Sequence, residues 1–396
     1  MGTLHDIDLP DSTVALRCDF NVPLNEEGEI TDDLRIAAAL PTINALREEG
    51  SRVVILAHLG RPEGARVAEL TLAPVARRLS QLLGIPVAFS ASPNTDREVI
   101  DTLTAGDVAL LENVRFDPRE TSKDPRARQE LARNWASWAD SYVSDGFGVV
   151  HREQASVTEL ATLVPNAAGL LVARESEVFA QLLQGAQRPY TVILGGSKVG
   201  DKLGVIQSLL PRVDNLLIGG GMAYTFLLSM GLGIGGSIAQ PDFVEAARGF
   251  LTQAQDLGVN LMLPVDFVVA DRFAPDAITA TVDQDSIPAD QMGLDIGPRT
   301  RELYSQIIRD SATIVWNGPM GVFEMPAFAG GTLAVARAMA DSTGFTVIGG
   351  GDSAAAVRML EVDQSKFDHI STGGGASLEF LEGKNLPGLT VLEGSK

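Results

Sequence analysis

Short runs of apolar and β-branched residues recur along the whole chain and alternate with stretches of helical periodicity. Apolar runs of about four to eight residues bounded by turn residues are typical of buried strands. They predict strands near 13–18, 52–57, 107–111 and 141–144 in the first half, and near 191–194, 215–218, 261–263, 313–316, 345–348 and 369–372 in the second. Because helical stretches separate most of these runs, the pattern indicates an α/β fold of parallel sheets with crossover helices.

Helical periodicity is clear in four segments between the N-terminus and the middle of the chain. Three of them lie at 36–48, 72–83 and 126–139. The fourth, LLVARESEVFAQLLQ at 170–184, carries apolar residues at three- and four-residue spacing and is followed by the turn-forming string GAQRPY. Such punctuation after a long helix predicts a junction between domains. We interpret this helix as a hinge element.

The length of 396 residues exceeds what one hydrophobic core usually supports, so two domains of roughly 150–200 residues each are expected. We predict a first domain at 1–170, a connecting hinge helix at 171–187 and a second domain at 188–382. The segment 271–298 is expected to be irregular because it contains three prolines and several acidic residues. The tail at 383–396 is expected to have no helix of its own and to pack back on the first domain.

The acidic composition narrows the possible partners. The formal net charge is −20 and both halves of the chain are acidic, so neither nucleic acid nor an anionic membrane is an expected partner. The chain has no run approaching the roughly 18 apolar residues of a membrane helix, and its N-terminus has no signal-peptide pattern. Its single cysteine, Cys18, excludes an intramolecular disulfide. We expect Cys18 to be a small buried hydrophobe in a cytoplasmic protein.

Polar and basic residues follow every predicted strand of the first half. They are Asp19 and Asn21 after the first strand, His58 and Arg61 after the second, Arg115 and Arg152 after the next two, and Arg35 at the start of a helix. The carboxyl ends of parallel strands converge at one edge of a sheet, and arginine forks there suit an anion held in a fixed pose. A single arginine is usually a surface charge, but this convergence favours a polyanion site.

Glycine-rich loops follow the predicted strands of the second half, at 195–196, 219–221, 318, 349–351 and 373–375. Bare amides at helix starts suit phosphates. The string LGGSKVGDKL (194–203) is not a Walker A loop, but it is predicted to place Lys198 and Lys202 in the first turns of a helix, where they could neutralise phosphate. Lysine is scarce, with 6 residues against 25 arginines, so this pair favours a function over a chance solvated face.

Two further strings contain candidate ligand-binding residues, and a third matches a binding motif only by its glycine spacing. In VIGGGDSAAA (347–356), Asp352 could ligate Mg²⁺ together with phosphates, although Asp352 or Ser353 could equally cap a helix. In IVWNGPMGVFE (314–324), Asn317 ends a strand and Glu324 could hold ribose hydroxyls, although most glutamates are surface acids. The string GLGIGG (231–236) matches a dinucleotide fingerprint, but it follows a helical stretch, and we reject that interpretation.

An anion site in one half and phosphate-binding loops in the other together suggest a kinase. The four histidines have no metal-ligand spacing, so a zinc site is not indicated, and the absence of a GxSxG elbow disfavours a serine hydrolase. Two alternatives remain. One is a nucleotide-dependent regulatory protein that has lost turnover, and the other is an NAD-dependent dehydrogenase, which the misplaced glycine motif disfavours.

Taken together and in order, these strings closely resemble phosphoglycerate kinases. The matching segments are RCDFNVPL (17–24), DDLRIAAALPTI (32–43), AHLGRP (57–62), LLENVRF (110–116), HRE (151–153), LGGSKVGDKL (194–203), GGGMAYTFL (219–227), LDIGP (294–298), WNGPMGVFE (316–324), IGGGDSAAA (348–356) and STGGGASLE (371–379). The resemblance implies two doubly wound, Rossmann-like parallel-sheet domains joined by a hinge helix, in a monomeric cytoplasmic enzyme. It implies reversible Mg²⁺-dependent transfer of a phosphoryl group between 1,3-bisphosphoglycerate and ADP, giving 3-phosphoglycerate and ATP in glycolysis.

By motif match, the resemblance also implies roles for individual residues. The glycerate substrate would be held by Asp19, Phe20, Asn21, Arg35, His58, Leu59, Gly60, Arg61, Arg115 and Arg152. The nucleotide would be held by Lys198, Lys202, Gly293, Asn317, Glu324, Gly350, Gly351, Asp352 and Ser353, with Asp352 also at the metal. The catalytic set would be Arg35, Lys202, Gly350 and Gly351.

The implied chemistry is in-line transfer to a carboxylate that is already ionised at neutral pH. Alignment, charge neutralisation and domain closure are therefore expected in place of a general base. Two departures from the family pattern stand out. Residues 151–154 are His-Arg-Glu-Gln where many relatives have His-Arg-Ala-His, which leaves Arg152 in place but removes the second histidine. Ser353 replaces a frequent threonine and keeps the hydroxyl.

Overall fold

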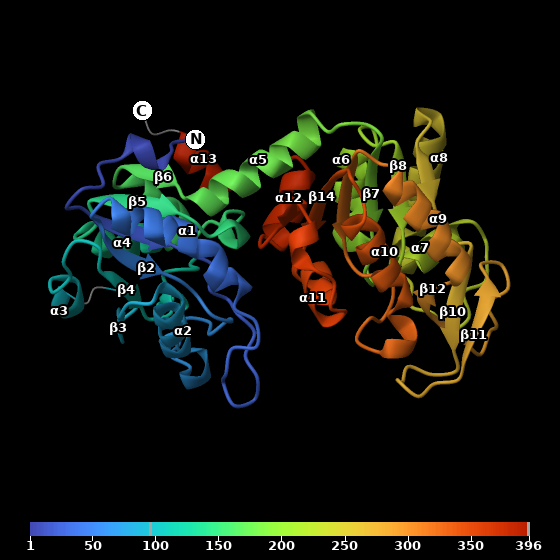
Figure 1. Cartoon of the computed structure of the whole chain (residues 1–396), viewed down its shortest axis with the longest axis horizontal. Helices are drawn as coiled ribbons and strands as arrows, with labels where there is room; N and C mark the ends of the chain where they lie inside the picture. Colours follow the sequence, from blue (N-terminus) through green and yellow to red (C-terminus); the bar gives the residue numbers. More distant parts are fainter. Residues whose placement is uncertain (95–96, 394–396) are drawn as a thin grey trace. The chain divides into compact units, whose positions relative to one another are not determined.

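The computed structural model describes residues 1–94 and 97–393, and the chain divides into two compact units (Figure 1). The first unit contains Met1–Glu177 together with Asn385–Lys396, and the second contains Val178–Lys384. Helix α5 (Leu170–Gln184) begins in the first unit and ends in the second. Residues 394–396 of the predicted tail lie outside the described residues.

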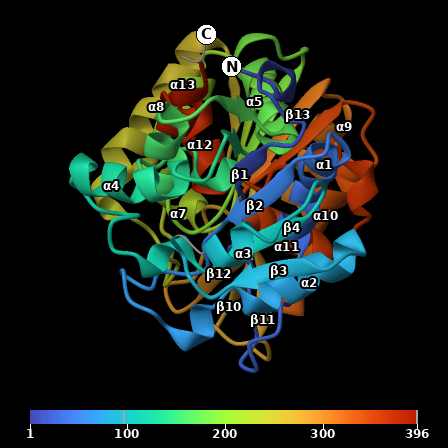
Figure 2. The ribbon, with the colours of Figure 1, turned by 90° about the vertical axis from the view of Figure 1, so that its left-hand side faces the viewer.

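The first unit is built on a six-stranded parallel sheet with the strand order β3-β4-β2-β1-β5-β6. Its strands are β1 (Thr13–Arg17), β2 (Arg52–Leu56), β3 (Val87–Ser90), β4 (Val108–Leu111), β5 (Ser141–Ser144) and β6 (Asn166–Ala168). Figure 2 shows β1, β2, β4 and β3 side by side. The chain extends the sheet from β1 to one side and then restarts at β5 on the other. This reversal makes the carboxyl ends of β1 and β5 a switch point, where open α/β sheets bind ligands.

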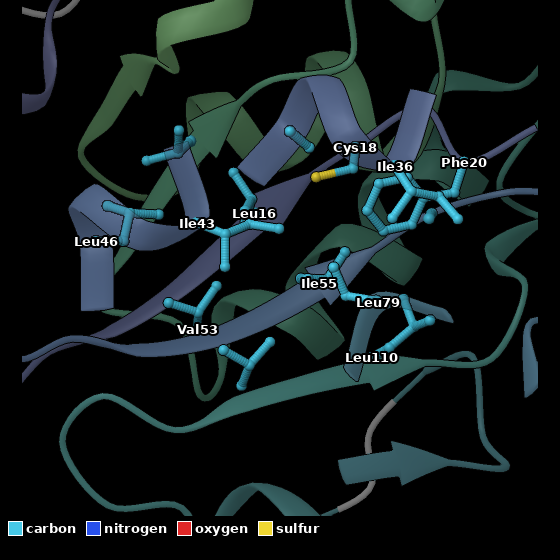
Figure 3. Close-up of a cluster of buried hydrophobic side chains, with 14 of the residues drawn as sticks. Leu16, Cys18, Phe20, Ile36, Ile43, Leu46, Val53, Ile55, Leu79 and Leu110 are labelled. Carbon is cyan, nitrogen blue, oxygen red and sulfur yellow. The ribbon is translucent and has the colours of Figure 1, made fainter. Parts of the chain in front are cut away.

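Both faces of this sheet are buried. The helices that complete the unit are α1 (Leu34–Glu48), α2 (Ala73–Leu83), α3 (Arg97–Ile100), α4 (Pro125–Ala136) and α13 (Pro387–Glu393). On one face, Ile43 of α1 and Leu79 of α2 pack in one core with Leu16 and Ile55 of the sheet (Figure 3). Ala15 points to the opposite face, because side chains alternate along a strand, and it is also completely buried. Burial on both faces explains why these strands have continuous apolar runs.

The second unit contains another six-stranded parallel sheet, with the order β15-β14-β13-β7-β8-β9. Its strands are β7 (Tyr190–Leu194), β8 (Asn215–Ile218), β9 (Asn260–Met262), β13 (Thr313–Asn317), β14 (Phe345–Gly349) and β15 (His369–Ile370). The chain builds β7, β8 and β9 outward and then returns to the centre with β13, where Asn317 pairs with Leu194. The carboxyl ends of β7 and β13 therefore form the switch point of this sheet. The two sheets confirm the predicted doubly wound α/β class.

The prediction that 271–298 is irregular is wrong. Strand β10 (Asp266–Ala270) pairs antiparallel with β11 (Thr279–Asp283) and with β12 (Met292–Ile296), and the three form a separate sheet. Most residues of β11 are exposed, and β12 is interrupted by Gly293. Neither strand therefore has the apolar run that marks a buried strand in the sequence.

The expectation that the tail has no helix is also wrong, because α13 covers Pro387–Glu393. This helix is joined to the first unit by backbone hydrogen bonds, from Gly2 N to Leu392 O at 3.0 Å and from Gly388 N to Val150 O at 2.8 Å. A helix of seven residues is too short to show a clear period in the sequence. Among the described residues, no helix is both long and apolar enough to span a membrane.

The helices of the second unit connect its strands and include three that begin at the glycine-rich loops 219–221, 349–351 and 373–375. They are α6 (Leu203–Leu209), α7 (Met222–Ser229), α8 (Val244–Leu257), α9 (Pro298–Arg309), α10 (Gly330–Ala340), α11 (Gly351–Met359) and α12 (Gly375–Leu381). The string GLGIGG at 231–236 follows α7 and no strand, which removes the structural context that a dinucleotide fingerprint requires.

Candidate active site

The carboxyl edge of the first sheet gathers most of the predicted basic residues into one cluster. Burial and the charges of Arg17, Arg115, Arg35 and Arg152 lower the pKa of His58 well below its usual value. Arg35, Arg115 and Arg152 are therefore within electrostatic range of one imidazole, and we call these three arginines around His58 the arginine cluster. Arg61 is not among the groups that contribute most to the shifted pKa values of His58 and Arg115.

Arg35 is held at the start of α1 by the loop that follows β1. Its Nη1 donates to Asp19 Oδ1 at 3.1 Å and to Asn21 O at 3.1 Å. Asn21 N also donates to Asp19 Oδ1, at 3.2 Å, and the Asp19 side chain is 7% exposed. The Asp19 carboxylate and the Asn21 carbonyl therefore both bind one guanidinium nitrogen and fix its orientation. The Arg35 side chain stays 28% exposed.

Arg115 is partly buried, as Arg35 is. Its Nη1 donates to Gly60 O at 2.8 Å, and Gly60 N in turn donates to Asn21 Oδ1 at 2.8 Å. Burial lowers the pKa of Arg115 to about 10, which leaves it charged at neutral pH. Its Nε is buried and has no hydrogen-bond partner. An unsatisfied buried donor on a cation is costly, and an oxygen of an anionic ligand would satisfy it.

Two further arginines leave their charges free. Arg61 and Arg152 are exposed, and within the part of the chain that the structure describes neither side chain makes a hydrogen bond or an ion pair. Next to Arg152, the Nδ1 atom of His151 is buried without a partner, and burial together with Arg152 lowers the pKa of His151 to about 4. His151 is thus a neutral polar group beside the arginine cluster that the sequence did not single out.

Many residues of the matched motifs have side chains in the hydrophobic core, among them Cys18, Phe20 and Leu59. Cys18 and Phe20, both labelled in Figure 3, are completely buried, and Leu59 of the same core is 2% exposed. The prediction that Cys18 is a buried hydrophobe is confirmed. Phe20 and Leu59, predicted to contact the substrate, can contribute only main-chain atoms. The adjacent Gly60 has a φ of 63°, and a Cβ there would lie 2.6 Å from Leu70 Cδ2.

In the second unit, the switch point of the sheet carries a glycine-lined cavity of about 290 Å³. Its lining includes Gly195 and Gly196 after β7, Asn317 at the end of β13 and Gly318 after it, Gly350, Gly351, Asp352 and Ser353 at the start of α11, and Lys198 and Lys202. The Ser353 hydroxyl accepts from Gly318 N at 2.7 Å and is completely buried. These loops bring main-chain amides and the N-terminus of a helix to one cavity, which is the usual arrangement for binding phosphate.

Lys202 points into this cavity from a buried position. Its side-chain ammonium donates to Asn317 Oδ1, and Asn317 Nδ2 donates to Gly349 O at 2.8 Å, which fixes the orientation of the amide. Burial lowers the pKa of Lys202 to about 8, against the charges of Asp201 and Asp352, which raise it. Lys198 is exposed and precedes the helical turn Gly200–Lys202. The prediction that both lysines lie in the first turns of a helix is therefore wrong for Lys198.

A second cavity, of about 490 Å³, adjoins the first and shares Gly196, Ser197 and Asp352 with it. It contains the predicted Gly293 and Glu324, and apolar walls that the sequence did not indicate, from Tyr224, Ile238, Phe267, Phe273, Met292 and Leu294. A Cβ on Gly293 would collide with the Tyr224 hydroxyl. An apolar slot with an exposed carboxylate suits a base and a ribose. No local sequence pattern could have found these walls, because they come from separate segments.

The donor set of these cavities fits a magnesium ion that arrives with phosphates. Among the described residues, no group of three or more His, Cys, Asp or Glu side chains forms a metal site of its own. Asp352 lines both cavities, and Mg²⁺ commonly binds through one or two carboxylates plus substrate phosphates. Asp352 therefore suits a nucleotide-bound ion rather than a resident metal.

The arginine cluster on one doubly wound unit, and a glycine-lined cavity with an adjoining apolar cavity on the other, fit a nucleotide-dependent phosphotransferase. A sequence model of the family described as phosphoglycerate kinase matches residues 4–384. The phosphoglycerate kinase of Leifsonia xyli subsp. xyli is 55% identical over 386 residues, covering 96% of each chain. That of Bifidobacterium adolescentis is 53% identical over 406 residues, covering 99% of this chain and 100% of its own. The chain belongs to the phosphoglycerate kinase family.

Solved structures agree with this assignment. The phosphoglycerate kinase of Coxiella burnetii has a TM-score of 0.87 at 39% identity and covers 100% of this chain and 99% of its own. That of Pyrococcus horikoshii OT3 has a TM-score of 0.88 at 35% identity and covers 99% and 98%. The family uses ATP or ADP with Mg²⁺ and transfers a phosphoryl group to a carboxyl acceptor. The predicted family and enzyme class are confirmed, and the dehydrogenase alternative is wrong.

Proposed function

We propose that the chain transfers a phosphoryl group reversibly between 1,3-bisphosphoglycerate and ADP, and that the two substrates bind to different units. The observation that carries the substrate assignment is the buried, unpartnered Nε of Arg115 beside exposed, unpaired Arg152. In a protein of net charge −20, free cationic donors at a sheet switch point are best explained by an anionic ligand.

On the first unit, we assign Arg61, Arg115, Arg152 and His58 to the phosphate of the glycerate substrate and to its orientation. Asp19 and Asn21 hold Arg35 and can also contact substrate hydroxyls, whereas Phe20, Leu59 and Gly60 offer main-chain atoms. We assign Arg35 to the transferring phosphoryl group. Its guanidinium is fixed on one side by Asp19 Oδ1 at 3.1 Å, which leaves its other donors for the negative charge of the transition state.

On the second unit, we assign Lys202 and the amides of Gly350 and Gly351 to the phosphoryl group that moves, and Lys198, Asn317 and Ser353 to the neighbouring phosphates. Gly293 and Glu324 would face the nucleoside in the adjoining cavity. Asp352 would hold the nucleotide-bound Mg²⁺, which neutralises phosphate charge when it is bound. The support for this assignment is that one cavity contains Lys202, Asp352 and the start of α11.

The chemistry needs no general base, because the accepting carboxylate is ionised about three pH units below neutrality. What the protein must supply is in-line alignment, neutralising charge and exclusion of water. We propose that closure of the two units excludes water from the reacting groups. We propose α5 as the hinge, because this helix belongs to both units. Small-angle scattering tests this step. Compaction is expected only when both substrates are present, and an unchanged radius of gyration would refute closure.

The test of the reaction is ATP-dependent phosphorylation of 3-phosphoglycerate with Mg²⁺, coupled to reduction of the acyl phosphate. Lys202→Ala should abolish most of the turnover of the unmodified protein. Lys366→Ala, at an exposed lysine outside both cavities, is the matched control and should leave turnover unchanged. ATP binding without any turnover in the unmodified protein would favour the regulatory alternative instead.

Two remaining properties are proposed from the family resemblance. We propose that the enzyme acts as a monomer, which light scattering would support with a mass near 41.9 kDa and would refute with a mass twice as large. We also propose a cytoplasmic location, in keeping with the reducing environment that its single free cysteine suits. Fractionation of the source cells with detection of the native protein tests this location.

A further inference from the structure

Arg17 is a buried arginine that the assigned reaction does not use. It is the last residue of β1 and is completely buried, so its guanidinium cannot be an exposed contact for an anion. A buried guanidinium stays charged and needs a partner for each of its donors. Its Nη1 donates to Cys18 O, and the remaining donors lead in two directions, toward a buried acid and toward His58.

The acid is Glu120, and Ser156 connects it to Arg17. Arg17 Nε donates to Ser156 Oγ at 2.7 Å. Ser156 Oγ donates to Glu120 Oε1 at 2.6 Å, and Ser156 N donates to Glu120 Oε2 at 2.9 Å. Glu120 and Ser156 are both completely buried. Burial raises the pKa of Glu120, and the charge of Arg17 opposes that rise. We call Glu120, Ser156 and Arg17 the buried relay.

The other end of the relay reaches His58. Arg17 Nη2 lies 3.3 Å from His58 Nδ1. A guanidinium has only donors and does not lose its proton in proteins, so the contact is a hydrogen bond only if Nδ1 is the acceptor. The proton of a neutral His58 must then be on Nε2, which has no hydrogen-bond partner among the described residues. The alternative acceptor for a proton on Nδ1 is Asp19 Oδ1, and at 3.9 Å it is too far for a hydrogen bond.

The charges around His58 support the neutral ring. Arg17, Arg115, Arg35 and Arg152 all disfavour a positive imidazole, as does burial. The carboxylate that faces the ring, Asp19, already accepts from Arg35 Nη1 and Asn21 N through the same oxygen. A neutral histidine among arginines can still donate one hydrogen bond to an anion, provided that its proton is on the nitrogen that faces the ligand.

We propose that Arg17 is a positioning residue: through the buried relay it fixes His58 in the tautomer protonated on Nε2, so that His58 donates to the anionic substrate. The part of this proposal that concerns substrate binding rests on the proposed function. If the ring changed tautomer, the Nε2 lone pair would face the anion, and a donor would be replaced by a repelling acceptor. The loss of a hydrogen bond to a charged group weakens binding by about tenfold to a hundredfold.

The tautomer can be measured directly by ¹⁵N NMR of the imidazole rings. The chain has only 4 histidines, and His58→Gln assigns the signal of interest. In the unmodified protein, His58 should be neutral and protonated only on Nε2 across the range from about pH 6 to 9. A signal showing the proton on Nδ1, or a doubly protonated ring at neutral pH, would overturn the proposal without any variant.

The variants separate positioning from general destabilisation. Arg17→Met removes the donor but keeps an unbranched side chain, and it should yield a mixture of His58 tautomers and raise the KM for 3-phosphoglycerate by tenfold or more, with a smaller change in the KM for ATP. Arg128→Met is the matched control. Arg128 is 5% exposed and pairs with Glu159 at 2.6 Å and with Glu153 at 3.2 Å, so its loss should lower stability but leave the His58 tautomer unchanged.

If Arg17→Met does not fold, Ser156→Ala serves as the second variant. It keeps Arg17 but removes the hydroxyl between Arg17 and Glu120, so the His58 signal should broaden or split between tautomers and the KM for 3-phosphoglycerate should rise. An unchanged tautomer and an unchanged KM in the variant that folds would overturn the relay. Absence of turnover in an unmodified protein that shows the expected tautomer would overturn the proposed function and leave the relay intact.

Discussion

The conformation of Gly350 allows a sharp test of the phosphate cavity, because the next residue provides its own control. Gly350 precedes α11 with a φ of 91° and a ψ of 147°, a region that is essentially restricted to glycine. A Cβ at this position would also lie 2.8 Å from Asn317 Nδ2. At Gly351, one residue further on, φ is not in the left-handed region and a Cβ would meet nothing within 4 Å.

The structure sets the expected cost of Gly350→Ala. The strained backbone contributes about 1–3 kcal/mol, and displacement of the 4% exposed Asn317 amide adds a packing cost of about 1 kcal/mol. The second unit should therefore lose about 2–4 kcal/mol. For a unit of this size that corresponds to a fall in Tm of roughly 4–16 °C. Gly351→Ala places alanine in the first turn of a helix and should change stability by less than about 1 kcal/mol.

The assay must report on the second unit alone, because a chain of two units need not unfold in one step. Of the 3 tryptophans, Trp316 lies in β13 of the second unit, and the other two, Trp135 and Trp138, lie in the first. Thermal unfolding followed by fluorescence in a Trp135→Phe, Trp138→Phe background therefore reports the second unit. Equal losses for Gly350→Ala and Gly351→Ala would refute the argument from backbone conformation.

Gly350→Ala should also impair function through Asn317. The Asn317 amide is fixed by its bond to Gly349 O and in turn holds the Lys202 ammonium. A shifted amide releases the lysine that is assigned to the moving phosphoryl group. We expect kcat to fall by tenfold or more, since one misplaced charge at a transferring phosphoryl group is costly. Retention of full kcat in a destabilised Gly350→Ala protein would show that Asn317 does not position Lys202.

Three further predictions test single charges. Arg35→Ala should lower kcat by about 10³-fold, as is typical of an arginine in phosphoryl transfer. The coupled assay measures this loss, with Arg77→Ala, at an exposed arginine, as the control. A loss below tenfold would contradict the role of Arg35. Burial lowers the pKa of Lys202 to about 8 in the free enzyme. The affinity for ATP should therefore be full below that pH and should weaken as the pH rises through it. Calorimetry should show this loss of affinity in the unmodified protein and not in Lys202→Met. Burial raises the pKa of Asp145 from 3.8 to about 8. Between these two pH values the folded state binds one proton more than the unfolded state, so the free energy of unfolding should fall as the pH rises through that range. Urea denaturation should show this fall in the unmodified protein but not in Asp145→Asn, and identical pH profiles of the two proteins would refute the prediction.

The parallel sheets were predictable because their strands are buried on both faces. The runs TVALR in β1 and YTVIL in β7 are buried along their whole length, so an apolar run alone locates them. Burial does not explain every outcome, because β9 and β15 are not fully buried and were predicted, whereas β10 is buried along its whole length and was missed. Other strands that are short or lack full burial were missed. The predicted strand list omits β3, which has only one fully buried residue, and β6, which has three residues in total. It also omits β11, which is mostly exposed.

The candidate site was predictable where it depends on one segment. Arg115 and Asp352 lie within four residues of the ends of β4 and β14, so the rule that parallel strands end at one edge is enough to bring such residues to a site. The nucleoside cavity was not predictable in the same way. Tyr224, Phe267 and Phe273 come from α7, from β10 and from the turn after β10, and only the fold brings them together. Arg17 was visible only as the end of a strand, because its role depends on Ser156, which is 139 residues away.

The two units solve the same electrostatic problem in different ways. On the first unit, the compensating groups lie behind the cations: Asp19 fixes one nitrogen of Arg35, and the Gly60 carbonyl fixes one nitrogen of Arg115. The remaining donors are left for an anion, which the planar guanidinium forks can hold in a fixed pose. On the second unit, glycines would let main-chain amides approach the phosphates of a bound nucleotide without any loss of side-chain entropy. Lys202 has a fixed partner there, because Asn317, a neutral amide, holds it without cancelling its charge.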